Sequence, residues 1–569
     1  MQTNIKIITF ASILLLSACS KNPMLEETEN DSAISQPATV TSADNSTVSQ
    51  PAPLLAERKL DEAMYAGTPA KAKIMMQPQP QFSTAYVADA LRVDREKYPD
   101  AEVNGIKQVS QEPVSTFSID VDTASYSNVR RMLNQGYLPQ ADAVRVEEMV
   151  NYFSYDYPEP ENRPFSIYQE VGPSPFNADR KLLHIGIQGK KMAAAERPPA
   201  NLVFLIDVSG SMQSPNKIGL LKNAFKLLTR QLTAADSVAI VVYAGAAGTV
   251  LEPTSGQDKN AIMDALERLQ AGGSTNGGAG IQAAYRFAGQ HVNRSGINRV
   301  ILATDGDFNV GAVNQDALKN LIESERKTGI ELSILGFGAG NYNDALMQEL
   351  AQNGNGNAYY IDTLNEARKV LVEELSATLV TIAKDVKIQI EFNPALVSEY
   401  RLLGYETRAL KREDFNNDKV DAGEIGAGHT VTAIYELALR NSNNKAVDPL
   451  RYQPADDKRS ANPSELAFLR LRYKAPQGDT SELIEMPVPL ASMKKQLRDT
   501  SNSYRFSAAV AGFAELLRGG NYLSTMGFTD VLQLAQQSKG EDAGGYRGEF
   551  IQLVNLARAL APQQAATNE

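Results

Sequence analysis

The hydrophobic pattern between residues 200 and 383 alternates between two periods. Short runs of consecutive apolar residues, such as Leu202 to Ile206, are typical of strands buried on both faces of a parallel sheet. Between these runs the apolar residues recur at helical spacing, most clearly after Lys217. We predict strands near residues 201–206, 237–243, 248–251, 299–304, 331–337 and 358–361. We predict helices near residues 216–232, 258–270, 278–292, 314–328, 344–352 and 365–382. This alternation is typical of an α/β fold with a doubly wound, mostly parallel sheet.

The sequence on either side of this block has a different pattern. From Val386 to Phe392 apolar and polar residues alternate strictly, which predicts a strand with one face in water. Further strands are predicted near residues 117–122, 165–171, 181–188, 400–405, 430–438 and 465–473, and helices near 123–134, 144–152, 504–518, 528–538 and 547–560. The strands favour a β-sandwich-like domain that flanks the α/β block or receives it as an insertion.

These patterns divide the chain into segments. Residues 26–53 are mostly polar, Pro and Ala, and cannot bury enough apolar area to form a core. The predicted segments are a lipoprotein signal peptide (1–18), a disordered tether (19–110), an N-terminal α+β segment that contributes strands to the sandwich (111–199), the α/β domain (200–383), a β-rich domain (384–500) and a C-terminal helical segment (501–569).

The N-terminus carries the features of an export signal. Lys6 precedes an apolar run from Ile7 to Leu16, which is too short to span a bilayer as a mature helix. The following Leu-Ser-Ala-Cys resembles the bacterial lipobox, which implies cleavage before Cys19 and acylation (palmitate included) of that residue. An export signal cleaved elsewhere is the alternative. Ser20 stands where the inner-membrane retention signal has Asp, so the resemblance implies an outer-membrane anchor that faces the periplasm.

Charge and composition exclude several classes of partner. The net charge is −11 and the chain has no basic run, which argues against nucleic acid. The three histidines, His184, His291 and His429, are far apart, so a zinc site is not expected. The loop Gly336 to Gly340 has the spacing Gly-x-Gly-x-Gly, which close helix–strand packing explains better than a nucleotide, and no Walker A motif occurs.

Oxygen-bearing side chains follow the predicted strands at three places. Asp207, Ser209 and Ser211 form an Asp-x-Ser-x-Ser pattern directly after the first strand, Thr275 lies in a glycine-rich loop, and Asp305 ends another strand. In an open α/β sheet, ligands bind beyond the carboxyl ends of the strands. Carboxylates and hydroxyls without His or Cys favour a hard divalent cation, with Mg²⁺ first and Mn²⁺ or Ca²⁺ as alternatives. For the first pattern alone, helix capping by a serine is the simpler explanation.

The five residues together resemble the metal-ion-dependent adhesion site (MIDAS) of von Willebrand factor type A (VWA) domains. That family draws Asp-x-Ser-x-Ser, a Thr and an Asp from three loops in this order, which correspond here to Asp207, Ser209, Ser211, Thr275 and Asp305. The resemblance implies that the open position of the metal takes an Asp or Glu side chain of a partner protein. The order of segments along the chain is similar to the YfbK-type lipoproteins of Gram-negative bacteria.

Two other acidic segments are weaker candidates. Asp120 and Asp122, with Ser125 and Ser127, resemble a second metal loop, although helix capping explains them more simply. The segment from Asp414 to Asp418 opens like a calcium loop but lacks its glycine and its final glutamate, so a polar hairpin turn is the better interpretation.

The sequence therefore predicts a non-enzymatic, lipid-anchored envelope protein that binds an acidic partner protein through a divalent cation. The alternative is a structural scaffold, in which the sandwich and the C-terminal helices hold the partner and the metal only stabilises loops. A cell-wall hydrolase is the weakest hypothesis, because no base is predicted beside Ser209 or Ser211. The predicted partners include no nucleotide.

Overall fold

Three β-sheets organise the protein in a computed structural model of the full chain. The structure describes residues 96–274, 277–306, 315–448 and 462–561. The signal peptide, the lipidation candidate Cys19, most of the predicted tether and the candidate ligand Thr275 lie outside the described residues. Within the described part, no helix is both long enough and apolar enough to cross a membrane.

The central sheet has the strand order β7-β6-β5-β8-β9-β10, and only β7 runs antiparallel to its neighbour. The strands are β5 (Ala200–Asp207), β6 (Ser237–Tyr243), β7 (Ala247–Ser255), β8 (Ile297–Thr304), β9 (Glu331–Phe337) and β10 (Ala358–Ile361). The order reverses between β5 and β8, which are the two strands that precede the candidate metal ligands. The prediction of a doubly wound, mostly parallel sheet is confirmed.

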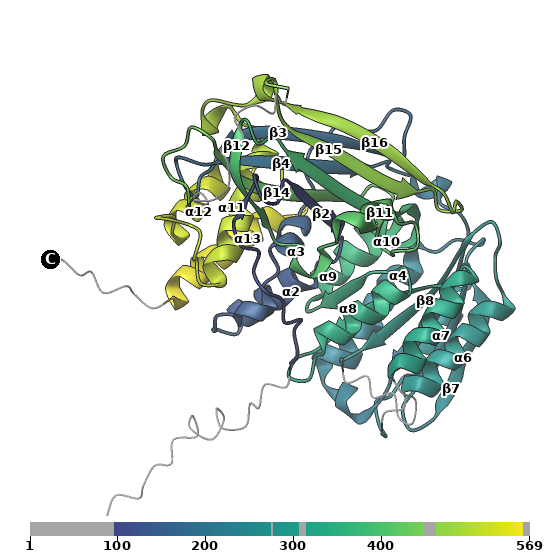
Figure 1. The fold of residues 1–569 in the computed structure, drawn as a ribbon. Coiled ribbons are helices and arrows are strands. Elements are labelled where there is room, and N and C mark those ends of the chain that lie inside the picture. Colours follow the sequence, from purple (N-terminus) through teal and green to yellow (C-terminus); the bar gives the residue numbers. More distant parts are fainter. Residues whose placement is uncertain (1–95, 275–276, 307–314, 449–461, 562–569) are drawn as a thin grey trace, which may run out of the picture. The chain divides into compact units, whose positions relative to one another are not determined.

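Helices cover both faces of this sheet (Figure 1). Along β5, Leu202, Phe204 and Ile206 face one helical layer, whereas Val203 and Leu205 face the other. The first layer contains α4 (Leu220–Gln231), α5 (Lys259–Glu267), α9 (Leu364–Arg368) and α10 (Leu375–Leu379). The second contains α6 (Gly277–Gln290), α7 (Gln315–Lys327) and α8 (Asp344–Asn353). Burial on both faces explains why these strands read as continuous apolar runs.

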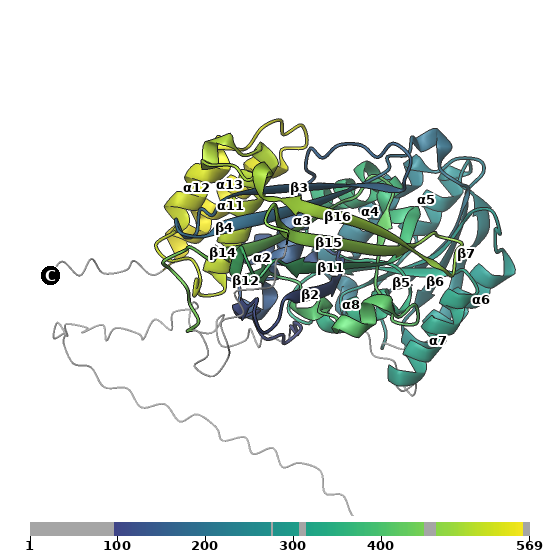
Figure 2. The same ribbon diagram turned by 45° about the horizontal axis from the view of Figure 1, so that its top comes forward.

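The other two sheets are antiparallel and combine strands from both sides of the α/β domain. One has the order β1-β12-β14-β4-β3, and the other β13-β11-β15-β16, with β2 also paired to β11; Figure 2 shows β2, β11, β15 and β16 running side by side. Their bounds are β1 (Lys107–Gln108), β2 (Val114–Ser118), β3 (Phe165–Pro173), β4 (Lys181–Gly189), β11 (Thr381–Phe392), β12 (Val397–Leu403), β13 (Gly423–Gly426), β14 (Thr430–Leu439), β15 (Glu465–Lys474) and β16 (Ser481–Pro489). The α/β domain is thus inserted in a sandwich.

The prediction of a wet face on the strand from Val386 to Phe392 is wrong. Lys387 is 2% exposed and Gln389 6% exposed, because the segment around Arg412–Asn416 covers this face of β11. The Lys387 ammonium donates to the carbonyl oxygen of Asn417 at 2.7 Å. The side chains of Lys387 and Gln389 therefore bond to a covering loop rather than to water, whereas Glu391 at the end of the strand is exposed.

Helices from both ends of the described chain form a separate layer with its own apolar core. These helices are α2 (Ala124–Asn134), α3 (Val146–Asn151), α11 (Asn502–Leu517), α12 (Phe528–Gln537) and α13 (Tyr546–Leu560). Phe153, Phe506 and Phe550 stack edge to face in this core, with ring centroids 5.1–5.6 Å apart. The core therefore joins segments that are about 400 residues apart in the sequence.

The tether ends earlier than the sequence analysis placed it. Residues 96–110 are described: Lys97 pairs with Asn343, and Lys107–Gln108 pairs with β12. Glu96 is ion-paired with Arg131 at 2.7 Å. The polar composition of this segment hid its order, since its fixed points are hydrogen bonds rather than apolar contacts.

One buried arginine connects α2 to the α/β domain and to the last helix. Arg130 is 1% exposed; its guanidinium bonds Asp362 after β10 at 2.8 Å, Glu366 of α9 at 2.8 Å and Glu549 of α13 at 3.0 Å. Removing such a cation would leave two buried carboxylates uncompensated, so this contact is strongly coupled to the native arrangement.

His184 supplies a prediction about stability at low pH. It is buried on β4 between the hydroxyls of Tyr157 and Ser507, and burial lowers its pKa to about 3. Between pH 6.5 and 3 this histidine is protonated in the unfolded chain but neutral in the folded chain. The free energy of unfolding therefore falls as the pH falls through this window, by about 4 kcal/mol at pH 3. Urea unfolding of His184→Gln should show a shallower loss than the parent protein. Parallel pH profiles for the two proteins would contradict this assignment.

Candidate metal centre

The candidate site lies at the carboxyl edge of the central sheet, where the strand order reverses. β5 ends at Asp207 and its neighbour β8 ends at Thr304, one residue before Asp305. Both carboxylates are fully buried, whereas Ser211 is exposed on the turn after β5. Parallel pairing of the two strands brings residues about 100 positions apart to one edge, as the sequence analysis expected.

Asp207 is held by neutral donors. Its Oδ1 accepts the backbone N–H of Ser209 at 2.8 Å, and its Oδ2 accepts the hydroxyls of Tyr243 and Thr304, each at 3.2 Å. Burial raises the pKa of Asp207 above its usual range against the hydrogen bonds from Ser209, and the charge of Asp305 adds to the rise. Among the described residues no lysine or arginine is ion-paired with this carboxylate.

Two hydroxyls connect Asp207 to Asp305. The Oγ atoms of Ser209 and Ser211 are 2.9 Å apart, and Ser211 hydrogen-bonds to Asp305. The structure thus brings together four of the five residues that the sequence analysis selected. That they bind a metal stays a prediction.

Thr275 lies outside the described residues, but the loop before it adjoins the site. The N–H of Gly210 donates to the carbonyl of Gly273 at 3.0 Å, and the N–H of Gly272 donates to the carbonyl of Val208 at 2.8 Å. Gly273 has a φ of +93°, a conformation that L side chains rarely adopt. These two backbone hydrogen bonds hold the glycine-rich loop against the turn that carries Ser209 and Ser211.

The sequence analysis missed Lys217. This residue is 8% exposed in the turn before α4, and its ammonium lies 2.9 Å from Oδ2 of Asp305 and 3.1 Å from Oδ1 of Asn341. Burial alone would raise the pKa of Asp305, but Lys217 outweighs burial and holds it below the usual range. A lysine at the start of an amphipathic helix usually faces solvent, so the pattern held no signal for this contact.

The donor set fits a hard divalent cation. No group of three His, Cys, Asp or Glu side chains that could hold a metal occurs among the described residues. Hydroxyl oxygens must therefore supply part of any shell here. A buried carboxylate that receives only neutral hydrogen bonds is incompletely compensated, and a cation bound beside it would complete the compensation.

Comparisons with known proteins agree with this architecture. Family models match residues 201–374 (von Willebrand factor type A domain), 92–184 (von Willebrand factor) and 377–560 (Uncharacterized protein YfbK, C-terminal). The Escherichia coli (strain K12) protein named Uncharacterized protein YfbK is 47% identical over 495 residues, which cover 85% of each chain. The chain belongs to the YfbK family.

More distant similarities extend beyond the YfbK family. An uncharacterized protein of Synechocystis sp. is 26% identical over 318 residues, which cover 55% of this chain and 70% of that protein. A solved von Willebrand factor type A structure from Catenulispora acidiphila is 16% identical with a TM-score of 0.38 and covers 68% of this chain and 89% of that one. The resemblance to VWA domains and to YfbK is thus confirmed at the level of family and fold.

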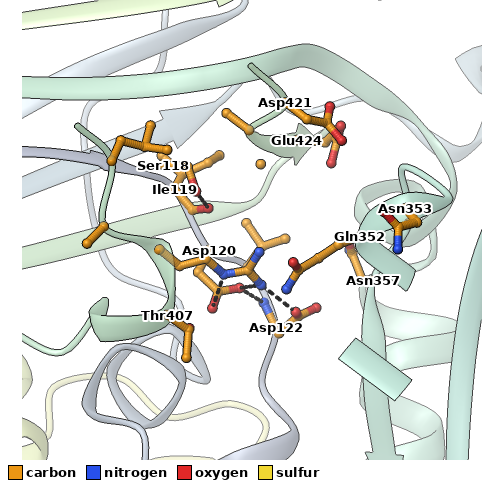
Figure 3. Close-up of a pocket in the computed structure, with 17 residues that line it drawn as sticks. Ser118, Ile119, Asp120, Asp122, Gln352, Asn353, Asn357, Thr407, Asp421 and Glu424 are labelled. Atoms are coloured by element: carbon orange, nitrogen blue, oxygen red, sulfur yellow. Dashed lines mark hydrogen bonds and ion pairs between the residues drawn. The ribbon is translucent and has the colours of Figure 1, made fainter. Parts of the chain in front are cut away.

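A second metal loop at Asp120 and Asp122 does not form. Both carboxylates line a pocket of about 270 Å³, where Arg408 donates to Asp120 at 3.0 and 3.1 Å and to Asp122 at 2.9 Å (Figure 3). Ser125 turns away from them and donates to the carbonyl of Ala143 at 2.7 Å. A guanidinium therefore compensates the pair that was considered for a metal.

Helix capping does not explain this acidic pair either. Thr123, the residue before α2, makes no capping hydrogen bond with its side chain. The backbone N–H of Ser125 in the first turn of α2 donates instead to Glu148 of α3 at 2.8 Å. The calcium-like segment is likewise structural, since Arg412–Asn416 forms a short 3₁₀ helix and Asp418 is ion-paired with Arg472 at 3.4 Å.

The contact between Arg408 and the two aspartates predicts a specific stability pattern. Arg408→Met should lower the free energy of unfolding by about 3–5 kcal/mol, because it leaves two buried carboxylates without a cation. Adding Asp120→Asn and Asp122→Asn to Arg408→Met should recover a large part of the loss. Urea unfolding of the single and triple variants measures both effects. Equal stability of Arg408→Met and the parent protein would show that the pair is not held by this arginine.

Proposed function

We propose that this YfbK-family protein is a lipid-anchored envelope protein that binds a partner protein through a divalent cation. The cation, Mg²⁺ first among the candidates, would be held by Asp207, Ser209, Ser211, Thr275 and Asp305. The partner would present an Asp or Glu side chain, whose carboxylate completes the coordination shell.

The observation that carries this proposal is the incomplete compensation of Asp207. Its two oxygens receive a backbone N–H and the hydroxyls of Ser209, Tyr243 and Thr304, all of them neutral, and the charge of a second carboxylate, Asp305, raises its pKa further. Fully buried carboxylates are normally paired with a cation or bound to a metal. Ser211, which is exposed, hydrogen-bonds to Asp305, and its hydroxyl lies 2.9 Å from the hydroxyl of Ser209.

The described candidate ligands would lie at different distances from the metal. Asp207 and the two serine hydroxyls face one another on a single turn and would supply the nearest oxygens. Asp305 already accepts Lys217 and Ser211, so it is suited to an outer position. A bound divalent cation supplies electrostatic attraction for an external carboxylate, which is a strong and directional contact in a partly buried groove.

Anchoring rests on the N-terminal sequence. Acylation of Cys19 would attach the chain to the outer membrane, with the folded part in the periplasm. Nothing in the described site resembles a hydrolytic centre: the described surroundings of Ser209 and Ser211 contain carboxylates and Lys217 but no histidine in hydrogen-bond contact. We therefore propose a binding protein rather than an enzyme.

Calorimetric titration with Mg²⁺ tests this proposal. Asp207→Ala should reduce the affinity for Mg²⁺ by about 100-fold or more, because it removes the carboxylate around which the other oxygens are arranged. Asp207→Asn, which keeps the shape and loses the charge, should give the same loss. The exposed Asp142→Ala on the turn before α3 is the control and should bind as the parent protein does.

Equal Mg²⁺ binding by Asp207→Asn and the parent protein would overturn the proposal. Crosslinking in the envelope separates it from the scaffold alternative. A partner held through the metal should be lost in EDTA and in Asp207→Asn alike. A scaffold that holds its partner with the sandwich or the C-terminal helices should keep that partner under both conditions.

A further inference from the structure

The candidate metal centre contains a cation of its own. The Lys217 ammonium lies between Oδ2 of Asp305 and Oδ1 of Asn341, at 2.9 and 3.1 Å. Of the two buried acids at the site, only Asp305 has this ion pair among the described residues. The site is therefore asymmetric: one carboxylate is paired with a lysine and the other is held only by neutral donors.

The position of Lys217 is fixed by the loop after β9. A Cβ atom on Gly338 would lie 2.3 Å from Cε and 2.5 Å from Cγ of Lys217, so the aliphatic part of the lysine occupies the space that a side chain at 338 would need. Gly338 also has a φ of +79°, which favours glycine. The lysine side chain can thus extend past residue 338 to Asp305 because glycine has no side chain there.

The same loop is held from its other side by the N-terminal segment. The N–H of Gly340 donates to Glu96 at 2.7 Å, and Glu96 is ion-paired with Arg131 of α2 at 2.7 Å. Asn341, the second acceptor of the Lys217 ammonium, follows directly. The lysine is therefore a fixed part of the site rather than a mobile surface side chain.

The charges at the site decide what this lysine does. Among the described residues of the site, two carboxylates and one ammonium leave one net negative charge, and a divalent cation converts this to one net positive charge. Without the lysine, the same cation would only neutralise the two acids. At short range and low exposure such a difference in charge is weakly screened, so it acts on both the cation and any ligand that follows it.

We propose that Lys217 sets the charge of the metal centre, so that the cation alone binds weakly and the loaded centre attracts an anionic ligand. This inference rests on the proposed function, because it assumes that the cation binds beside Asp207. Lys217 is a positioning residue: it holds Asp305 by one oxygen and repels the incoming cation. A carboxylate from a ligand then lowers the net charge of the loaded site from one positive charge to zero.

A purely structural role makes a different prediction. If the contact only stabilises the turn before α4, removing the ammonium should lower the melting temperature and leave the affinity for the cation unchanged. A charge-setting role should increase that affinity and decrease the affinity for an anion. The two readouts move in opposite directions, which general damage to the site would not produce.

The test uses Mn²⁺ as the probe on the full-length protein in detergent, with free Mn²⁺ followed by electron paramagnetic resonance. Lys217→Met and Lys217→Gln should each bind Mn²⁺ at least about tenfold more tightly than the parent protein. Lys222→Met is the matched control, since Lys222 lies five residues further on, in the first turn of α4, and donates to the Glu267 carbonyl at 2.9 Å, away from the site. It should stay within about twofold of the parent. Two replacements of different polarity guard against a variant that fails to fold.

Fluoroacetate reports the second half of the inference. Its ¹⁹F resonance is broadened when the carboxylate lies near bound Mn²⁺, and the parent protein at saturating Mn²⁺ should broaden it at least about threefold more than Lys217→Met does. Unchanged Mn²⁺ affinity in both Lys217 variants, with binding abolished by Asp207→Asn, would overturn the role of Lys217 alone. Absence of binding in the parent and in both Lys217 variants would overturn the role of Lys217 and the proposed function together. Equal broadening in the parent and in Lys217→Met would overturn the selection of anions.

Discussion

The candidate site depends on one constraint. Asp207 is a carboxylate buried at the end of a parallel strand, and it has no cationic partner among the described residues. Asp207 receives only neutral hydrogen bonds, and a second acid lies close by. Burying such a charge costs free energy, so we expect the carboxylate to make a contact that a hydrophobic side chain could not make. The doubly wound sheet makes this arrangement available, because β5 and β8 end side by side where the strand order reverses. Under the proposed function, nearby hydroxyls and Lys217 would determine which cation can bind and how strongly.

The surroundings of the α/β domain keep the site in a fixed frame. The domain is inserted between strands that pair with each other, so both of its connections enter the same sandwich. Arg130 adds buried ion pairs between α2 and the segment after β10, and Arg408 adds buried ion pairs within the sandwich, to the segment after β2. The segment from Glu96 reaches the loop that carries Asn341, next to the candidate metal ligands. Glu96, the first described residue, therefore lies within two contacts of the candidate site.

Periodicity was sufficient to predict the α/β domain, because its strands other than the edge strand β7 are buried on both faces and its helices on one. The carboxyl ends of these strands then placed Asp207 and Asp305 together by topology alone. Other features depend on contacts that no local pattern encodes. Lys387 alternates like a wet strand position but is covered by a loop, and β16 carries Pro487 and Pro489, which argue against a strand unless it lies at a sheet edge. The contact between Lys217 and Asp305 depends on the space that Gly338 leaves for the lysine side chain. Gly338 is more than a hundred residues from Lys217 in the sequence, so no local pattern indicates this contact.

Anomalous diffraction from crystals of this protein grown with Mn²⁺ would decide whether the buried acid has the role assigned to it. The account predicts one strong peak within about 2.2 Å of an oxygen of Asp207, with Ser209 and Ser211 in the same shell. The Lys217 ammonium should remain on Asp305 in that structure. A peak that lies elsewhere, or no peak beside Asp207 at millimolar Mn²⁺, would contradict the account.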